Sequence, residues 1–294
     1  MEKMKKIAIT TDTNSGMMPH ENEAQGIFVL PMPFIVDEVA QLESVDLSRE
    51  DFYEKLIAGS NITTSQPSVG ELVDFWTEIL KEYDEIVHVP TSSFLSASFA
   101  TAKAQAEDFN GRVHLVDNHR ISVSLKSSVF DAVKLRDAGQ SADEIVQTLE
   151  TIGPNYGIYF SIETMQYLKK GGRISPAAAT IGSILKLRPV LCLSDGKLEK
   201  YTIAKSMTKA RIAMKEAIKN DLNGKFKEYA EKGEMRLVCV YGNNPEESKA
   251  FEEEIKALFP NVPFLYNDPM SLSIACHTGP GVVSVGLVRV LGNS

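Results

Sequence analysis

Two short segments of the sequence are dense in hydroxyl groups, and each adjoins an expected helix. Thr63 to Ser65 lies in an expected loop before one helix, and Ser92 to Ser96 follows a strand and opens another. A helix N-terminus offers unpaired N–H groups and a positive dipole end, so it favours an anion. Capping is the commoner use of such hydroxyls. Each segment alone is therefore explained as a cap, and anion binding is the functional alternative.

A basic segment, Lys169-Lys170-Gly171-Gly172-Arg173-Ile174-Ser175, is the sharpest local pattern. Two glycines allow a tight turn after a helix, which leaves Arg173 on an exposed loop. Arginine holds a carboxylate or phosphate through two parallel hydrogen bonds. An ordinary helix end with a solvated basic side chain explains the same residues equally well.

A histidine stands in an expected Gly-Pro loop, His277-Thr278-Gly279-Pro280-Gly281, just before the last expected strand. An imidazole there can donate to an oxyanion or pass a proton. A structural histidine bonded to the backbone is the commoner role. The other histidines lack the spacing of metal ligands, so no metal site is predicted.

Several enzyme signatures are absent from the sequence. We find no GxSxG elbow, no GxxxxGK[ST] loop, and no GxGxxG after the first strand. These absences argue against an α/β-hydrolase, a Walker nucleotide site and a dinucleotide-binding fold.

Expected strands and helices alternate up to about residue 152, which predicts a mostly parallel sheet with helices on both faces. Pro31 and Pro33 make the second strand an edge or an irregular strand. Ser68 with Glu71, and Ser141 with Glu144, predict capping boxes. The expected strands are 5–12, 27–36, 85–89 and 113–116. The expected helices are 49–58, 68–83, 96–109, 121–138 and 141–152.

Beyond residue 155 the pattern indicates a mixed or antiparallel sheet backed by helices. Asp195-Gly196 predicts a hairpin, and Ser175-Pro176 predicts the start of a helix. We therefore expect two α/β domains, residues 1–154 and 155–294. The expected strands are 156–162, 189–194, 198–203, 236–241 and 282–290. The other expected helices are 163–170, 206–219 and 246–259.

Composition sets further bounds on function. The chain has 294 residues and a formal charge of -8, which argues against nucleic acid or an anionic membrane as the main partner. Its three cysteines have no CxxC spacing, so reduced thiols are expected. The apolar run Ile7 to Ile9 is too short for a signal peptide, and no stretch reaches the ~20 apolar residues of a membrane span. We expect a cytoplasmic protein.

Together these segments resemble the DegV family of fatty-acid-binding proteins over nearly the whole chain. Each motif alone is weak, but their order along the chain is specific. The matching segments are Ile9-Thr10-Thr11-Asp12, Thr63-Thr64-Ser65-Gln66-Pro67-Ser68, Ser92-Ser93-Phe94-Leu95-Ser96, Val116-Asp117, Leu168 to Ser175, Arg188-Pro189, Asp195-Gly196 and His277 to Gly281.

The resemblance implies a two-domain α/β protein of the DegV-like (EDD) fold, with one long-chain fatty acid in a tunnel between the domains. It implies the lipid-carrying subunit of a bacterial fatty acid kinase. A separate ATP-dependent subunit, related to dihydroxyacetone kinases, would phosphorylate the carboxylate for phospholipid synthesis. The bound fatty acid is a ligand, no cofactor is expected, and the chain alone would not be a full enzyme.

The resemblance also assigns roles to residues. The family's carboxylate contacts fall on Thr64, Ser96 and His277, with Ser65 and Ser93 as neighbours. Arg173 would hold the head group, or contact the phosphate or the partner. Ala97-Ser98 replaces the usual Gly-Thr, and a Cβ at Ala97 narrows the approach of a ligand to the backbone N–H. Candidates for lining the acyl chain, each of which could equally be ordinary core, are Phe94, Phe99, Ile174, Ile181, Ile184 and Leu185.

Two other functions remain open. A lipid hydrolase or acyltransferase would use Ser96 as nucleophile and His277 as base, and would need a third group to orient the histidine. No carboxylate is placed by the sequence for that role. A lipid-responsive regulator without kinase coupling is the second alternative.

Overall fold

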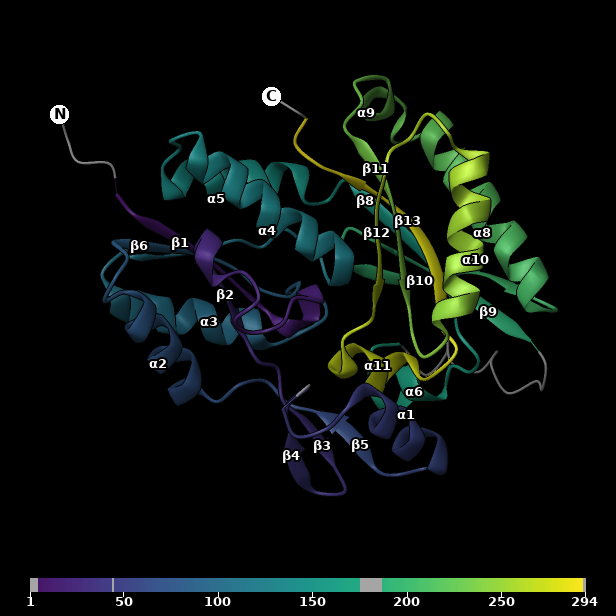
Figure 1. Ribbon diagram of the computed structural model, residues 1–294, viewed down its shortest axis with the longest axis horizontal. Coiled ribbons are helices and arrows are strands. Elements are labelled where there is room, and N and C mark those ends of the chain that lie inside the picture. Colours follow the sequence, from purple (N-terminus) through teal and green to yellow (C-terminus); the bar gives the residue numbers. More distant parts are fainter. Residues whose placement is uncertain (1–4, 44, 175–186, 293–294) are drawn as a thin grey trace. The chain divides into compact units, whose positions relative to one another are not determined.

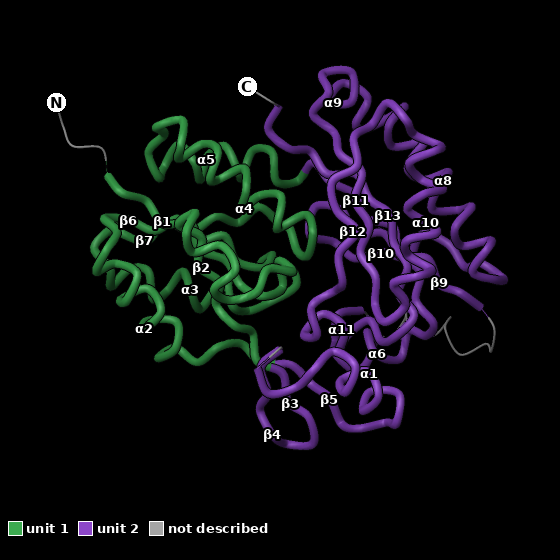
Figure 2. Tube along the Cα trace, viewed as in Figure 1, with its two compact units in different colours: residues 1–33, 65–154 green, residues 34–64, 155–294 purple. Residues whose placement is uncertain are grey.

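The computed structural model describes residues 5–43, 45–174 and 187–292, which form two compact units (Figure 2). Unit 1 comprises residues 1–33 and 65–154, and unit 2 comprises residues 34–64 and 155–294. These units differ from the expected domains in one segment. Residues 34–64, expected in the N-terminal domain, group with the C-terminal part of the chain.

Unit 1 is built on a parallel four-stranded sheet in the order β2-β1-β6-β7 (Figure 1). Every residue of β1 is buried, as expected for an inner parallel strand covered on both faces. The second expected strand is an edge strand, but it ends before Pro31. The strands are β1 (Ile7–Asp12), β2 (Ile27–Leu30), β6 (Glu85–Val89) and β7 (Val113–Leu115).

Helices cover both faces of this sheet, which confirms the expected fold class. Helices α4 and α5 pack on one face, and α2 and α3 lie on the other (Figure 1). Trp76 of α2 is fully buried there, with Ile86 of β6 and Ala102 of α3 in the same cluster. The helices are α2 (Val69–Ile79), α3 (Ser98–Ala106), α4 (Ser122–Asp137) and α5 (Ala142–Ile152), with 3-10 turns η1 (Thr13–Ser15), η2 (Glu23–Gln25) and η3 (Glu107–Phe109).

Both expected capping boxes are present, at the starts of α2 and α5. At α5, the Ser141 hydroxyl accepts from the Glu144 N–H at 3.4 Å, and the Glu144 carboxylate accepts from the Ser141 N–H at 2.8 Å. The carboxylate also accepts from the Ser141 hydroxyl at 2.8 Å, and the two bonds that it accepts hold the pKa of Glu144 below its usual range. Each box satisfies helix N–H groups that would otherwise lack partners.

Replacing Ser141 with alanine should therefore destabilise unit 1 by about 1 kcal/mol, because a helix N–H loses its acceptor. Chemical denaturation would measure the loss. Gln147→Ala, at an exposed position of the same helix, is the matched control and should cost nothing. Equal stability of the two variants would contradict a role for the cap.

Unit 2 is built on a mixed six-stranded sheet in the order β10-β9-β8-β13-β11-β12, as expected for the second half of the chain. The hairpin predicted at Asp195-Gly196 is confirmed, and both residues have positive φ (48° and 71°), as a tight two-residue turn requires. The strands are β8 (Tyr156–Ser161), β9 (Arg188–Ser194), β10 (Lys197–Ala204), β11 (Met235–Tyr241), β12 (Phe264–Pro269) and β13 (Val283–Arg289).

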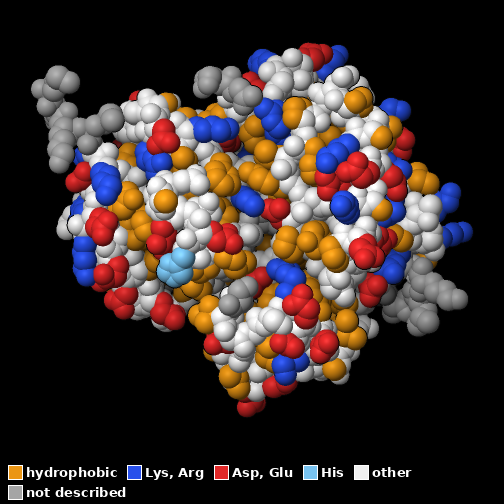
Figure 3. Space-filling view, viewed as in Figure 1, with side chains coloured by type: hydrophobic (Ala, Val, Ile, Leu, Met, Phe, Trp, Pro, Cys, Tyr) orange, Lys and Arg blue, Asp and Glu red, His pale blue; other side chains and the backbone are white. Residues whose placement is uncertain are grey.

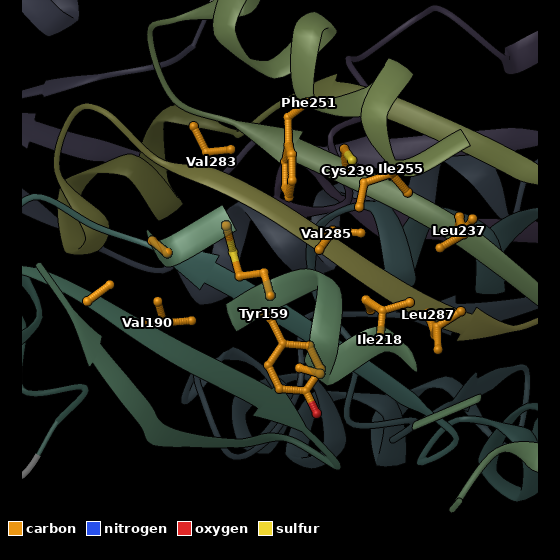
Figure 4. Packing of buried hydrophobic residues seen from close by; sticks show 14 of the residues in the cluster. Tyr159, Val190, Ile218, Leu237, Cys239, Phe251, Ile255, Val283, Val285 and Leu287 are labelled. Atoms are coloured by element: carbon orange, nitrogen blue, oxygen red, sulfur yellow. The ribbon is translucent and has the colours of Figure 1, made fainter. Parts of the chain in front are cut away.

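Alternate side chains of this sheet form the main core of unit 2. Val283, Val285 and Leu287 of β13 point to the same side and pack with Ile218 of α8 and Phe251 of α10 (Figure 4). Full burial of each such side chain contributes roughly 1.5–3 kcal/mol. Among residues 155–174 and 187–292, the helices are α6 (Gln166–Lys170), α8 (Met207–Asn223), α9 (Lys227–Glu231), α10 (Pro245–Leu258) and α11 (Leu272–Thr278).

The segment 34–64 adds a small antiparallel sheet, in the order β4-β3-β5, and one helix to unit 2. Its core residues Phe34 and Phe52 pack with Leu272 and Ala275 of α11. Its elements are β3 (Phe34–Val36), β4 (Val39–Gln41), β5 (Ile62–Thr64) and α1 (Arg49–Ala58).

Several expectations need correction. The run 27–36 is two strands in two sheets, β2 and β3, because the prolines interrupt it. Thr63 and Thr64 lie on strand β5, not in a loop. Elements α9, β12 and α11 were not expected. The helix predicted from Ser175-Pro176 lies outside the described residues.

Charged side chains of both signs are interspersed on the face shown in Figure 3. Pairs of opposite charge are common, as where Glu254 of α10 meets Arg211 at 3.2 Å and Lys215 at 2.9 Å, both on α8. Within the described ranges, no helix combines the length and the apolar character needed to cross a membrane.

Candidate functional site

Thr64 and His277, which are distant in sequence, are hydrogen-bonded in unit 2. Thr64 is the last residue of β5, which pairs antiparallel with β3 so that Thr64 lies opposite Phe34. The Thr64 hydroxyl oxygen is 3.0 Å from Nε2 of His277. Neighbouring Thr63 is exposed, because successive side chains of a strand point to opposite faces.

His277 lies in the last turn of helix α11, not in a Gly-Pro loop as expected. Burial and, as the smaller cause, the nearby charge of Arg173 together lower the pKa of His277 to about 4. The imidazole is therefore neutral at pH 7. Its Nδ1 atom is buried and has no hydrogen-bond partner among the residues described here.

Gly171 packs directly against this imidazole. A Cβ at Gly171 would lie 2.0 Å from Nδ1 and 2.7 Å from Cε1 of His277. The backbone of Gly171 is an ordinary helical one, with a φ of -76°. The glycine is thus required by the closeness of the ring and not by the backbone turn.

The second glycine, Gly172, serves the turn itself. Its φ is +69°, and the N–H of Arg173 donates back to the carbonyl of Leu168 at 3.0 Å. This is the usual way in which a left-handed residue ends a helix. The two glycines of the motif therefore have different functions, which the sequence alone did not separate.

Arg173 is exposed, as expected, and one of its guanidinium N–H groups donates to the carbonyl of Gly171 at 2.6 Å. It lies near enough to His277 for its charge to lower the pKa of that imidazole. Three predicted residues, Thr64, Arg173 and His277, are therefore brought together in unit 2. Ile174, next to Arg173, is half-buried.

A second contact fixes the chain after His277. Gly279 has a φ of +76°, and a Cβ there would lie 2.3 Å from Cδ2 of Tyr167 on α6. Helix α6, which Gly171 caps, and helix α11, which carries His277 and which Gly279 caps, therefore touch through glycine at two points.

The hydroxyls Ser93 and Ser96 lie in unit 1. The helix that follows them begins at Ser98, with Ala97 as its cap residue. The Ser96 hydroxyl accepts from the Ser98 N–H at 3.2 Å and lies 2.9 Å from the Ser98 hydroxyl. The Ser93 N–H donates to Asp117 at 3.4 Å. Ser96 is thus used locally at the start of α3, and its hydroxyl remains half-exposed.

The remaining predicted positions are more scattered. Ser65 is exposed and its hydroxyl donates to the carbonyl of Gln66 at 3.1 Å. Phe94 is 53% exposed and packs edge-on against His119, and Phe99 is half-buried. Three predicted lining positions lie outside the described residues: Ile181, Ile184 and Leu185.

Unit 1 also contains a small pocket with two buried titratable groups that the sequence did not indicate. The space open to the centre of a water molecule is about 20 Å³, enough for about one water. The pocket is lined by Asp12, Leu30, Met32, Gln66, Pro67, Leu72, His88, Pro90, Ser98, Thr101 and Ala102. It therefore adjoins residues that follow both hydroxyl-rich segments.

The titratable groups of this pocket are held in place by neighbouring strands. Asp12 accepts from the N–H and hydroxyl of Thr91 at 2.7 and 2.8 Å, while burial raises its pKa. His88 Nδ1 lies 2.7 Å from the Thr10 hydroxyl, and burial lowers the pKa of His88 to about 3. Such strand-end groups surround the place where parallel sheets bind ligands.

The described residues include no group of three or more His, Cys, Asp or Glu side chains that could hold a metal ion. They also place no carboxylate in hydrogen-bonding contact with His277, whose partner among these residues is Thr64. A serine hydrolase requires such an orienting group. Within the described residues, His277 therefore lacks the orienting carboxylate that such an enzyme uses.

The fold and this site define an α/β protein with a parallel-sheet unit, a mixed-sheet unit and a hydroxyl–imidazole pair beside an arginine. The family model described as "Uncharacterised protein, DegV family" matches residues 6–290. The chain belongs to the DegV family.

Relatives and solved structures agree with this assignment. The DegV domain-containing protein of Deinococcus radiodurans is 29% identical over 284 residues, covering 96% of this chain and 98% of the relative. A solved DegV family protein from Thermus thermophilus, described by its fatty acid binding, has a TM-score of 0.83 and 28% identity, with coverage of 97% and 100%. DegV of Bacillus subtilis, described as a fatty acid binding protein, has a TM-score of 0.80 and 28% identity, with coverage of 97% and 99%.

Proposed function

We propose that this protein binds one long-chain fatty acid, with Thr64, His277 and Arg173 holding the carboxylate. The observation that carries the proposal is the Thr64–His277 hydrogen bond beside an exposed arginine. The solved relatives from Thermus thermophilus and Bacillus subtilis, both described as binding fatty acid, support the ligand class. Ser65, Ser93 and Ser96 remain candidates for further hydrogen bonds to the same group.

The protonation of His277 explains how the pair would act. A neutral imidazole carries one N–H. Placed on Nε2, this hydrogen donates to the Thr64 oxygen, whereas placed on Nδ1 it would be buried against Gly171 without an acceptor. The Nε2–H form is therefore preferred. Thr64 then has its own O–H free to donate to a carboxylate oxygen.

Arginine and hydroxyl together suit a carboxylate that leaves water. Such a group needs replacement hydrogen bonds, or it takes up a proton instead. Arg173 supplies a permanent positive charge, and Thr64 supplies a donor. The acyl chain would contribute roughly 0.8 kcal/mol for each buried CH₂ group, so an apolar tunnel for it is part of the proposal.

Native mass spectrometry of protein purified without denaturation tests the ligand class. We expect a bound species whose mass, after extraction, matches a long-chain fatty acid. Recovery of ligand-free protein that also fails to bind added fatty acids would refute the proposal.

Replacing Thr64 with valine should weaken fatty-acid binding roughly tenfold, because the carboxylate loses a donor worth about 1–2 kcal/mol. The two side chains have nearly the same shape, so β5 should keep its pairing. Titration of delipidated protein with a fluorescent fatty acid would measure the change.

The neighbouring residue supplies the control for that variant. Thr63→Val alters an exposed position of the same strand, so its affinity should equal that of the unaltered protein. If both variants bind equally well, Thr64 does not contact the carboxylate.

We further propose that the protein presents its bound carboxylate to a separate ATP-dependent kinase subunit. The missing nucleotide motifs and the exposure of Arg173 support this coupling. Purified protein with ATP and fatty acid should give acyl phosphate only after such a kinase is added. Turnover by the protein alone would contradict the proposal, and a failure of any added kinase to act would favour a lipid-responsive regulator.

A further inference from the structure

A buried ion pair in unit 2 is hydrogen-bonded to the start of helix α11. The Glu43 carboxylate accepts from Arg49 at 2.7 Å with one oxygen and from the Leu272 N–H at 2.7 Å with the other. Arg49 also donates to the carbonyl of Met270 at 2.6 Å. The side chain of Glu43 is only 4% exposed. The first residue of α11, Leu272, and the residue before its N-cap, Met270, are thus bonded to Glu43 and Arg49.

Stability alone is a poor explanation for this pair. Burial raises the pKa of Glu43, which shows the cost of removing its charge from water, although Leu272 and Arg49 oppose the shift. Buried ion pairs seldom stabilise a fold more than apolar side chains of the same size would. They do fix geometry, since each bond has a narrow range of lengths and angles. A carboxylate at a helix N-terminus also interacts favourably with the helix dipole.

The helix held in this way is short and carries His277 at its other end. Between the two ends, Leu272 and Ala275 are buried against Phe34 and Phe52. Phe34 is the strand partner of Thr64. The small sheet of segment 34–64 carries Thr64, and α11, which packs against that segment, carries His277. A shift of α11 along its axis would therefore separate the two side chains.

We propose that Glu43 and Arg49 are positioning residues, which set α11 so that His277 meets Thr64. The inference rests on the proposed function for its effect on ligand binding, but the geometry of His277 can be measured without any ligand. Neither residue belongs to the fatty-acid contacts suggested above.

The Glu43→Gln variant tests the inference. Glutamine keeps an acceptor for the Leu272 N–H but loses the charge that holds Arg49. We expect the NMR signals of the His277 ring to move, with its pKa rising toward the ordinary value as the ring leaves its buried position. Fatty-acid affinity should fall roughly tenfold, the size usual for groups that orient a binding residue.

Two further variants keep the test decisive. Arg49→Lys retains a positive charge but has one terminal nitrogen in place of the two with which Arg49 bonds Met270 and Glu43, so it should move the His277 signals in the same direction. Glu54→Gln changes an exposed carboxylate on the same helix, α1, and should leave both His277 and affinity unaltered.

The outcomes separate positioning from a merely structural role and from failure of the proposed function. A lowered melting temperature in Glu43→Gln and Arg49→Lys, with unaltered His277 signals and affinity, would overturn the inference. Displaced His277 signals would support it even if the unaltered protein bound no fatty acid, a result that would refute only the proposed function.

Discussion

The Gly171→Ala substitution should reduce fatty-acid affinity roughly 30- to 100-fold while both units stay folded. The new Cβ would lie 2.0 Å from Nδ1 of His277, a separation that two non-bonded atoms cannot keep. The imidazole must therefore move and lose its bond to Thr64. Loss of a hydrogen-bonded pair costs about 2–3 kcal/mol, and 1.4 kcal/mol corresponds to a tenfold change.

The fold should tolerate this substitution because the φ of Gly171 is -76°, which alanine adopts readily. Alanine also lowers the entropy of the unfolded chain by about 0.4–1 kcal/mol, which offsets part of the strain. Circular dichroism and titration with a fluorescent fatty acid would give stability and affinity from one preparation.

Gly70 provides the matched control for Gly171→Ala. Gly70 lies on α2, where a new Cβ would find its nearest neighbour 4.0 Å away, at the Ser68 hydroxyl. Gly70→Ala should bind as the unaltered protein does. Full affinity in Gly171→Ala would show that His277 need not hold its observed position.

Unit 1 should lose stability in mild acid because of His88. The unfolded chain protonates this histidine below about pH 6.5, whereas the folded imidazole accepts a proton only near pH 3. Between these values the unfolded state binds more protons, so stability falls as pH falls. Each pH unit costs about 1.4 kcal/mol, which makes the loss about 2 kcal/mol at pH 5.

Asp12, in the same pocket, acts in the opposite direction. Its pKa is raised by burial, so the folded state takes up a proton at higher pH than the unfolded state does, and acid then stabilises the fold. The contribution of His88 must therefore be measured as a difference between variants rather than from one pH profile.

Trp76 offers a direct probe for that measurement. It is the single tryptophan of the chain, and its ring packs edge-on against His88 with 5.3 Å between ring centroids. Urea unfolding followed by Trp76 fluorescence should show a smaller loss between pH 7 and pH 5 in His88→Asn than in the unaltered protein. His20→Asn, at an exposed position, should not change the loss. Parallel pH profiles for all three proteins would contradict the prediction.

Local signals in the sequence predicted much of this fold correctly. Helix α1 has the expected bounds, both capping boxes are formed, and the hairpin at Asp195-Gly196 turns as predicted. In each case the deciding interactions lie within about four residues of one another. Propensities and side-chain caps report such interactions well.

The wrong expectations concern elements whose structure depends on contacts between residues distant in sequence. Strand β5 has three residues and exists because β3 pairs with it, so its two threonines resemble a loop when read alone. Helix α11 has only seven residues and ends beside Gly279 and Pro280, which hides its periodicity. Prolines split the run 27–36 between two sheets, which no local pattern could assign.

The candidate site shows the same division. Thr64, Arg173 and His277 were named from the sequence, through residue types and family order. The sequence did not show why residue 171 must be glycine, because no residue near it in the chain indicates that the His277 ring packs against its Cα. The pocket positions of His88 and of Asp12, which was named only within a matching segment, were also missed, since a strand position does not show whether a side chain faces a pocket.

Because unit 2 combines residues 34–64 with residues 155–294, the chain passes between the units three times, after residues 33, 64 and 154. During synthesis, the apolar cluster of Phe34 and Phe52 therefore cannot form until Leu272, more than 200 residues later in the chain, has been made. Such late-arriving contacts slow folding and expose apolar surface to aggregation. Neither half of the gene, cut at residue 154, would encode a self-sufficient piece.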